Sequence, residues 1–252
     1  MAFHSYSRVR NRDTLWLAVS HALVDGFSIP LIGINLCRAI NGHEIGCEAL
    51  SYSNYAAHLH SISSRQANYW STYLRDVVPS LFPQLNSSPA GHLHSETRQI
   101  DSERARKFCG AHGFTISNIF QVAWAPILRY YANTDDICSG YLTSGRDIPV
   151  HGIENAVGLF INMLKCRLQL DNSSPTLWIL QRNENSFVRS LEHQHCPLAQ
   201  MQIDSGFQHG SLLFNSIISY QVVTATATHN LDWDDMLDRL VWNLLIYAIP
   251  QR

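Results

Sequence analysis

The residue best suited to chemistry is His21, at the junction of an expected strand and an expected helix. An imidazole titrates near neutral pH and can accept a proton during a reaction. Asp25 follows four residues later and can orient the ring or the loop, and Gly26 permits a backbone turn that other residues resist. The spacing H-x-x-x-D-G alone is a weak pattern. Taken by itself, it is explained more simply by a structural histidine and a helix-capping aspartate.

Histidine and cysteine spacing decides whether a metal site is expected. The thirteen histidines include three H-x-H pairs, which are His58/His60, His92/His94 and His193/His195. A metal site needs a third ligand, and none recurs at a fixed offset from these pairs. The six cysteines are scattered with no C-x-x-C pair, so we expect free buried thiols and neither disulfides nor zinc. The sequence therefore predicts no metal.

The elements around His21 follow from the hydrophobic pattern. Residues 14–20 are a continuous apolar run rich in strand formers, which predicts a buried strand. A helix is expected to begin near Ser28, which can cap it, with Pro30 in the first turn and residues 41–42 at its end. His21 would then lie in a loop, where functional groups are often found.

The rest of the chain alternates predicted helices and strands. Helices are expected over 64–76, 102–112, 117–131 and 176–193, and strands over 137–143, 163–170 and 214–223. Pro126 implies a kink or a break in the helix that contains it. Residues 232–249 could form one amphipathic helix. This alternation is typical of an α/β or α+β fold.

Composition limits the class of protein. The 252 residues are 46% hydrophobic and 15% charged with a net charge of -2, which excludes both a disordered chain and the basic footprint of a general nucleic-acid binder. The apolar runs are too short to span a bilayer, and the first residues lack the apolar core of a signal peptide. We expect a cytoplasmic protein that binds neither nucleic acid nor membrane.

Several segments occur in the order of a known family. They are Tyr52 to Ala56 for Y-x-D-Y-A, Tyr69 to Leu74 for Y-W-x-x-x-L, Ser144 to Arg146 for S-G-R, Val157 to Arg167 for V-G-x-F-x-N-T-x-x-x-R, His193 to Leu198 for H-Q-x-x-P-F, and Leu213 to Ser216 for F-N-T. With Ser20 to Ser28 close to H-H-x-x-x-D-G, residues 13–221 resemble the condensation domains of nonribosomal peptide synthetases, especially fungal ones.

The resemblance implies a fold and a reaction. The fold would be the chloramphenicol-acetyltransferase-like α/β sandwich, with two lobes in a V and the active histidine between them. Two substrates would arrive on phosphopantetheine arms of peptidyl carrier domains in adjoining synthetase modules, and no cofactor would be bound directly. The acceptor amine would attack the donor thioester to form an amide, or an ester with a hydroxyl acceptor.

The resemblance also implies roles for particular residues. His21 would take or position the proton of the amine, Asp25 would form a structural ion pair with an arginine upstream of the motif, and Gly26 would let the backbone approach. Substrate-binding positions would be Ser20, Ser144, Asn162 and Ser216. Structural positions would be Arg146, Gly158 and Arg167.

The same resemblance predicts the division of the chain. Residues 79–94 carry prolines, serines and a glycine and would link the remainder of an N-terminal lobe, 1–78, to a C-terminal lobe, 95–221. Residues 222–252 depart from the family pattern and form a divergent tail. The family's opening S-x-A-Q-x-R and R-H-E-x-L-R segments are absent, so we expect a first lobe that is incomplete and a chain truncated at both ends. We expect such a polypeptide to be poorly active or inactive alone, because edges are exposed and Asp25 lacks its partner.

Three functional hypotheses follow. The first is a condensation domain, and Ser20 in place of the first histidine is found in fungal domains that include terminal cyclising ones. The second is a coenzyme A-dependent acyltransferase of the same fold, which is disfavoured because no D-F-G-W-G segment follows. The third is an inactive fragment or an interaction module.

Overall fold

The computed structural model describes residues 2–9, 12–44, 51–62, 67–82, 96, 98, 100–207, 211–220 and 245–248. The chain divides into two compact units. Unit 1 comprises Met1–Ser64 and Ser144–Asn162, and unit 2 comprises Arg65–Thr143 and Met163–Arg252. Residues 144–162 belong to unit 1, whereas the sequence-based division placed them in the C-terminal lobe. Most of the linker predicted over 79–94 lies outside the described residues.

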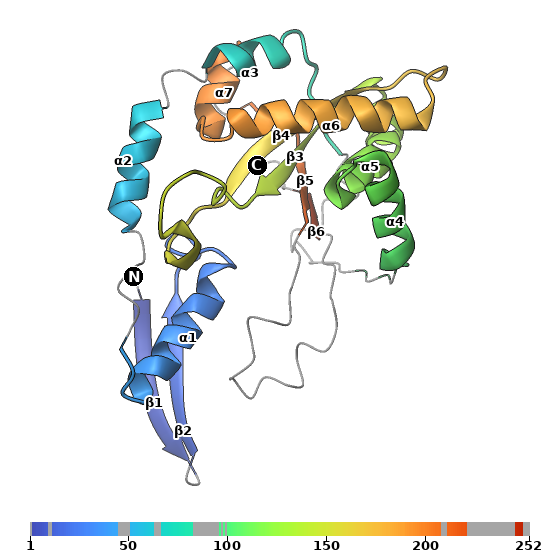
Figure 1. Ribbon diagram of the computed structural model, residues 1–252. Helices are drawn as coiled ribbons and strands as arrows, with labels where there is room; N and C mark the ends of the chain where they lie inside the picture. Colours follow the sequence, from blue (N-terminus) through green and yellow to red (C-terminus); the bar gives the residue numbers. More distant parts are fainter. Residues whose placement is uncertain are drawn as a thin grey trace, which may run out of the picture. The chain divides into compact units, whose positions relative to one another are not determined.

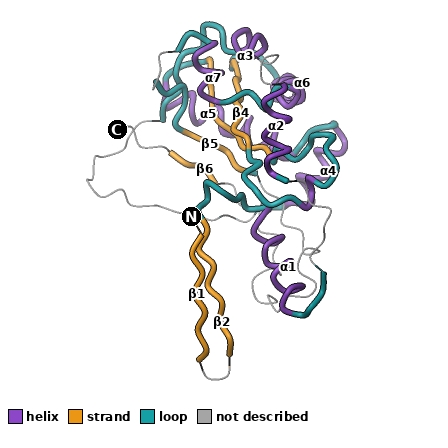
Figure 2. Tube along the Cα trace, turned by 90° about the vertical axis from the view of Figure 1, so that its left-hand side faces the viewer, coloured by secondary structure: helices purple, strands orange, loops and turns teal. Residues whose placement is uncertain are grey.

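Unit 1 contains a hairpin and helices. Strands β1 (Ala2–Val9) and β2 (Arg12–Val19) pair antiparallel, from Ala2 opposite Val19 to Val9 opposite Arg12 (Figure 2). The helices are α1 (Ser28–Ile40), α2 (Tyr52–Ile62) and the short 3-10 helix η2 (Ile153–Asn155). The strand and helix expected on either side of His21 are confirmed. Strand β1 and helix α2 were not predicted, although β2 needs a partner for its backbone groups.

Unit 2 is a sheet with helices (Figure 1). Its strands are β3 (Asp136–Thr143), β4 (Asn162–Gln169), β5 (Ser216–Ser219) and β6 (Leu245–Ala248), in the order β4-β3-β5-β6. Its helices are α3 (Ala67–Tyr73), α4 (Ser102–His112), α5 (Ile116–Ala132), α6 (Thr176–Glu192) and α7 (Leu198–Asp204). Strand β5 pairs parallel with β3 and antiparallel with β6. The mixed α/β class is therefore confirmed.

Local signals explain the boundaries of the central helices. The Asp101 carboxylate caps α4 by accepting from the Arg104 N–H, and Gly113 ends the helix with a φ of 69°. The Thr115 hydroxyl caps α5 in the same way. Helix α5 continues through Pro126, so the predicted break is absent. Proline removes only one backbone donor, and burial of one face of α5 holds the helix together.

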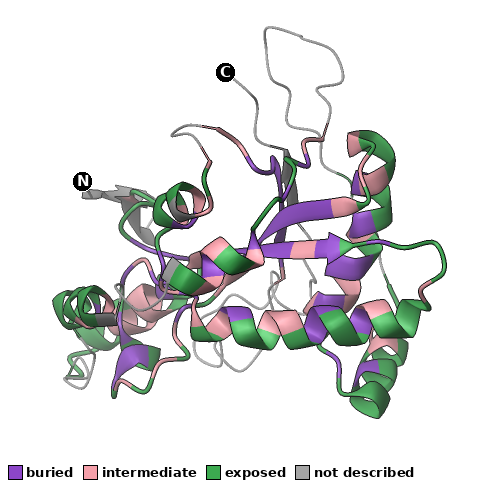
Figure 3. Ribbon diagram, turned by 90° about the horizontal axis from the view of Figure 1, so that it is seen from above, coloured by how far each residue is buried: buried purple, intermediate pink, exposed green. Residues whose placement is uncertain are grey.

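The hydrophobic core of unit 2 lies around the sheet. Figure 3 shows strands β3, β4 and β5 largely in the buried colour, and the largest fully buried side chains include Trp70, Leu74, Leu128, Leu164 and Met201. Each such side chain contributes about 1.5–3 kcal/mol by leaving water. The core therefore fixes β3 and β4, whose ends lead into and out of the 144–162 segment of unit 1.

Two predicted elements near the end of the chain need correction. The strand expected over 214–223 is observed over Ser216–Ser219, and residues 221–223 lie outside the described residues. The helix expected over 232–249 is wrong at Leu245–Ala248, which form strand β6. Pairing with β5 satisfies the backbone there, and tertiary pairing outweighs a helical pattern. The rest of that predicted helix is not among the described residues.

Candidate active site

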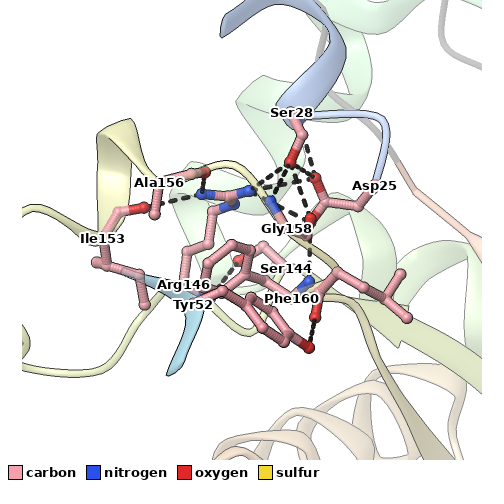
Figure 4. Close-up of polar contacts among 10 residues, drawn as sticks. Asp25, Ser28, Tyr52, Ser144, Arg146, Ile153, Ala156, Gly158 and Phe160 are labelled. Carbon is pink, nitrogen blue, oxygen red and sulfur yellow. Dashed lines mark hydrogen bonds and ion pairs between the residues drawn. The ribbon is translucent and has the colours of Figure 1, made fainter. Parts of the chain in front are cut away.

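The carboxylate of Asp25 is the centre of a buried polar network in unit 1 (Figure 4). Its Oδ1 accepts from the Ser28 N–H at 2.9 Å and from the Ser28 hydroxyl at 2.7 Å. Its Oδ2 accepts from the Phe160 N–H at 3.1 Å. The carboxylate therefore joins the start of α1 to a segment more than 130 residues away in sequence. Ser28 was expected to cap α1, but the capping acceptor is the Asp25 side chain, because Ser28 is already the first helical residue.

Arg146 is the ionic partner of Asp25. Its Nη2 lies 3.2 Å from Oδ1 and 3.4 Å from Oδ2, and the two side chains are 7% and 1% exposed. Its Nη1 donates to the carbonyls of Ile153 and Ala156 at 2.8 and 2.9 Å. The expectation that the arginine partner lies upstream of the motif is therefore wrong. The S-G-R turn supplies it 121 residues downstream, so Asp25 does not lack a partner.

Aromatic rings enclose the same guanidinium. Its Cζ lies 4.6 Å from the centroid of the Phe27 ring and 4.0 Å from that of Phe160. Tyr52 and Tyr55 in turn contact Phe160, with centroids 5.4 and 4.6 Å apart. These rings keep water from the ion pair, so the loss of either charge would leave the other buried without compensation.

Two glycines allow the backbone of residues 144–162 to approach closely. Gly145 has a φ of 62°, and a Cβ there would collide with the Phe160 carbonyl oxygen. A Cβ on Gly158 would collide with the Tyr52 ring, whose hydroxyl donates to the Leu159 carbonyl at 2.8 Å. Both positions therefore require glycine for packing around the Asp25–Arg146 pair.

His21 lies in an exposed turn before the network. The Leu23 N–H donates to the Ser20 carbonyl at 2.9 Å, and the Ala22 N–H donates to the Ser20 hydroxyl at 3.3 Å. His21, Ser20 and Gly26 are all exposed. Gly26 has no positive φ, and a Cβ there would meet no atom within 4 Å, so the expected need for glycine at this turn is wrong. The imidazole makes no hydrogen bond to any residue that the structure describes, and it is therefore open to an incoming molecule. Asp25 holds the loop through these contacts, and no hydrogen bond joins its carboxylate to the described His21 ring.

The other predicted site residues divide between the units. Ser144 is exposed, and its hydroxyl accepts from the Arg146 N–H at 3.4 Å. Asn162 is half-buried and hydrogen-bonds the Tyr55 hydroxyl, whose pKa burial raises to about 12. Both belong to unit 1, as does the Asp25 network. Tyr55 was not singled out as a site residue, although its motif was.

Arg167 and Ser216 lie in unit 2 and serve the sheet. Arg167 pairs with Asp136 through Nε–Oδ1 at 2.8 Å and Nη2–Oδ2 at 2.5 Å, and its Nη1 donates to the carbonyls of Tyr73 and Arg75. The bidentate pair raises the pKa of Arg167. Ser216 is buried, and its hydroxyl accepts from the Trp124 indole N–H at 3.3 Å. Through these contacts, both side chains stabilise the packing of unit 2.

The described histidine, cysteine and acidic side chains bear on metal and thiol chemistry. Over the described ranges, the structure holds no group of three histidine, cysteine, aspartate or glutamate side chains that could bind a metal ion. Among the described residues, no disulfide is formed by Cys37, Cys109, Cys138, Cys166 or Cys196, and Cys47 lies outside the described residues. Burial raises the pKa of Cys138 to about 12, which makes a reactive thiolate unfavourable there. In the part of the chain that is described, no helix is long and apolar enough to cross a membrane.

Comparisons with known proteins place these features in a family. The family model described as "Condensation domain" matches residues 1–237. Nonribosomal peptide synthetase atnA of Emericella nidulans is 38% identical over 211 residues, which are 81% of this chain and 3% of the synthetase. Nonribosomal peptide synthetase ungA of Aspergillus violaceofuscus is 40% identical over 82% of this chain and 2% of its own length. The chain therefore belongs to the condensation domain family.

Solved structures give the same fold. SeMet-CT matches with a TM-score of 0.68 at 19% identity, over 86% of this chain and 49% of that protein. The first condensation domain of the calcium-dependent antibiotic synthetase matches with a TM-score of 0.60 at 13% identity, over 87% and 58%. These likenesses confirm the predicted fold class. The chain spans about half the length of these structures and only a few per cent of the curated synthetases.

Proposed function

We propose that the chain works as a condensation domain in nonribosomal peptide biosynthesis and joins a carrier-tethered acyl or peptidyl thioester to an acceptor amine. The observation that carries the proposal is an exposed His21 in a loop whose far end is fixed by the buried Asp25–Arg146 pair. Such an arrangement leaves a proton acceptor accessible and holds its backbone in place. Membership of the condensation domain family supports the same reaction.

The chemistry assigns distinct roles to these residues. The amine nitrogen attacks the thioester carbonyl, a C–N bond forms, and the C–S bond breaks to release the thiol of the donor arm. His21 accepts or positions the proton that the amine loses. Asp25 pairs with Arg146 and acts on the loop, since its carboxylate is occupied by four donors from Ser28, Phe160 and Arg146. Ser20 and Ser144 are exposed in the same unit and could contact substrate.

The partners proposed are peptidyl carrier domains and adjoining synthetase modules, and phosphopantetheine arms would present both substrates. We infer that the reaction takes place in the cytoplasm, where such synthetases would find aminoacyl substrates. The product distinguishes the two reaction types, because linear coupling gives an extended peptide and cyclisation gives a ring. Ser20 in the position of the first histidine is compatible with both.

A substrate panel tests the proposal. The full chain is incubated with N-acetylcysteamine thioesters of the twenty amino acids. The donors carry an N-acetyl group, and the acceptors carry a free amine. The N-acetyl dipeptidyl thioesters that contain the new amide bond are measured by mass spectrometry. We expect amide above the background rate for at least one pair, because the chain contains the partner of Asp25 whose absence was the reason to expect poor activity. The same donors presented as coenzyme A thioesters test the second hypothesis, which would be favoured if coenzyme A donors gave the faster reaction. An absence of amide from every pair would contradict the proposal.

A second candidate function is a non-catalytic interaction module. Helix α1 and the loop before it expose a row of large apolar side chains, namely Leu23, Phe27, Ile29, Leu36 and Ile40. An apolar surface of this kind is typical of a site where another polypeptide packs. Self-association measured by analytical ultracentrifugation, together with the lack of any amide product, would favour this candidate over catalysis.

A further inference from the structure

The hydroxyl of Ser28 is fully buried and makes an unusually complete set of contacts (Figure 4). It can donate its hydrogen to Asp25 Oδ1 at 2.7 Å or to the Gly158 carbonyl at 2.8 Å. It accepts from the Gly158 N–H and from Arg146 Nη2, both at 3.1 Å. One hydroxyl therefore touches both partners of the ion pair and both backbone groups of Gly158.

Helix capping does not explain these contacts. The Asp25 carboxylate already accepts from the first N–H of α1, so the Ser28 hydroxyl is not needed for the cap. Its contacts instead run to Gly158, 130 residues further along the chain. The side chain thus joins the loop–helix junction to the segment that carries Arg146.

The same contacts bear on the position of His21. The Asp25 N–H donates to the Gly158 carbonyl at 3.1 Å, and the Ser28 hydroxyl reaches that same carbonyl. Within the described residues the His21 ring has no hydrogen bond of its own, so its place depends on where the loop is anchored. Removing the hydroxyl leaves the Gly158 N–H without its acceptor and frees the anchor to shift.

We propose that Ser28 is a positioning residue for the condensation reaction, because its hydroxyl hydrogen-bonds Gly158 and the Asp25–Arg146 pair and so holds the His21 loop in place. The inference rests on the proposed function and adds a residue to it. A misplacement of about 1 Å can lower a rate about 100-fold, so a small shift of the loop at this anchor should lower kcat strongly.

The test compares Ser28→Ala with Ser80→Ala in the full chain. Ser80 is an equally buried serine in unit 2, and its hydroxyl accepts from the Cys138 N–H at 2.9 Å. Both variants lose one buried hydroxyl, but only Ser28 touches the His21 anchor. With the thioester pair that the wild type uses best, we expect Ser28→Ala to lower kcat about 10- to 100-fold with KM within about twofold, and Ser80→Ala to keep both.

A second readout does not depend on turnover. Histidine-labelled protein gives ring NMR signals, and His21→Ala assigns the signal of His21. We expect Ser28→Ala to shift or broaden the His21 signal and leave the exposed His151 unchanged. The inference is overturned if the His21 signal is unmoved, if kcat is retained, or if Ser80→Ala loses as much. If the wild type forms no amide, the proposed function fails and the NMR result alone decides whether Ser28 positions the loop.

Discussion

The buried amine of Lys165 lowers the stability of the folded protein at neutral pH. Its side chain is fully buried in unit 2, and its Nζ has no hydrogen-bond partner among the described residues. The Trp70 ring centroid is 5.9 Å from Nζ. Burial lowers the pKa of Lys165 from 10.5 to about 8, although Cys138 and Cys196 nearby act in the opposite direction. The protein is therefore less stable at neutral pH than it would be with an apolar side chain of this shape.

The size of the effect follows from proton linkage. The unfolded state holds the proton up to a pKa of 10.5 and the folded state only to about 8, so the unfolded state binds more protons between these values and stability rises with pH there. Below pH 8 the penalty for the buried charge is complete and amounts to about 3 kcal/mol. At pH 9.5 it falls to about half of that.

The variant Lys165→Met removes this penalty. We expect it to raise the free energy of unfolding in urea by about 3 kcal/mol at pH 7 and by about half of that at pH 9.5. Lys107→Met is the control, because Lys107 is 76% exposed and its pair with Glu103 is a surface pair. An equal gain at both pH values, or a loss of stability in Lys165→Met, would refute the reasoning.

Further variants test the site and the sheet. Arg146→Met should lower the free energy of unfolding, measured in urea, by about 3–5 kcal/mol, because it leaves the buried Asp25 carboxylate without its ionic partner. A loss below about 1 kcal/mol would contradict a buried pair. Gly145→Ala should lower the melting temperature more than Gly42→Ala, since both have positive φ but only the first would meet backbone atoms; equal losses would contradict the close approach. Arg167→Met should cost about 2 kcal/mol through loss of the bidentate pair with Asp136, and unchanged stability would show that the pair is negligible.

Much of the fold can be predicted from the sequence where the signal is local. The helix expected over 102–112 is observed with these bounds as α4, and Gly113 ends it. The elements around His21 were likewise predicted from a strand-forming run and from Pro30 in the first turn of α1. Each of these boundaries depends on groups within a few residues of one another, so one stretch of sequence contains the whole signal.

The parts that could not be predicted depend on distant pairing. No local pattern joins Asp25 to Arg146, which are 121 residues apart, and the family resemblance implied a partner on the wrong side of the motif. Ser28 looked like a helix cap, and only the approach of Gly158 shows what its hydroxyl contacts. The helix predicted over 232–249 is wrong at strand β6, because a local hydrophobic pattern contains no information about pairing with the distant strand β5.

The most direct test of the central claim is the rate of amide formation by His21→Ala. A positioned acid or base contributes about 10²- to 10⁴-fold to a rate, so the variant should lose at least about 100-fold in kcat with the best thioester pair. His151→Ala, at another exposed histidine of unit 1, should keep the wild-type rate, and circular dichroism should show all three proteins folded. Amide formation by His21→Ala at the wild-type rate would contradict the account.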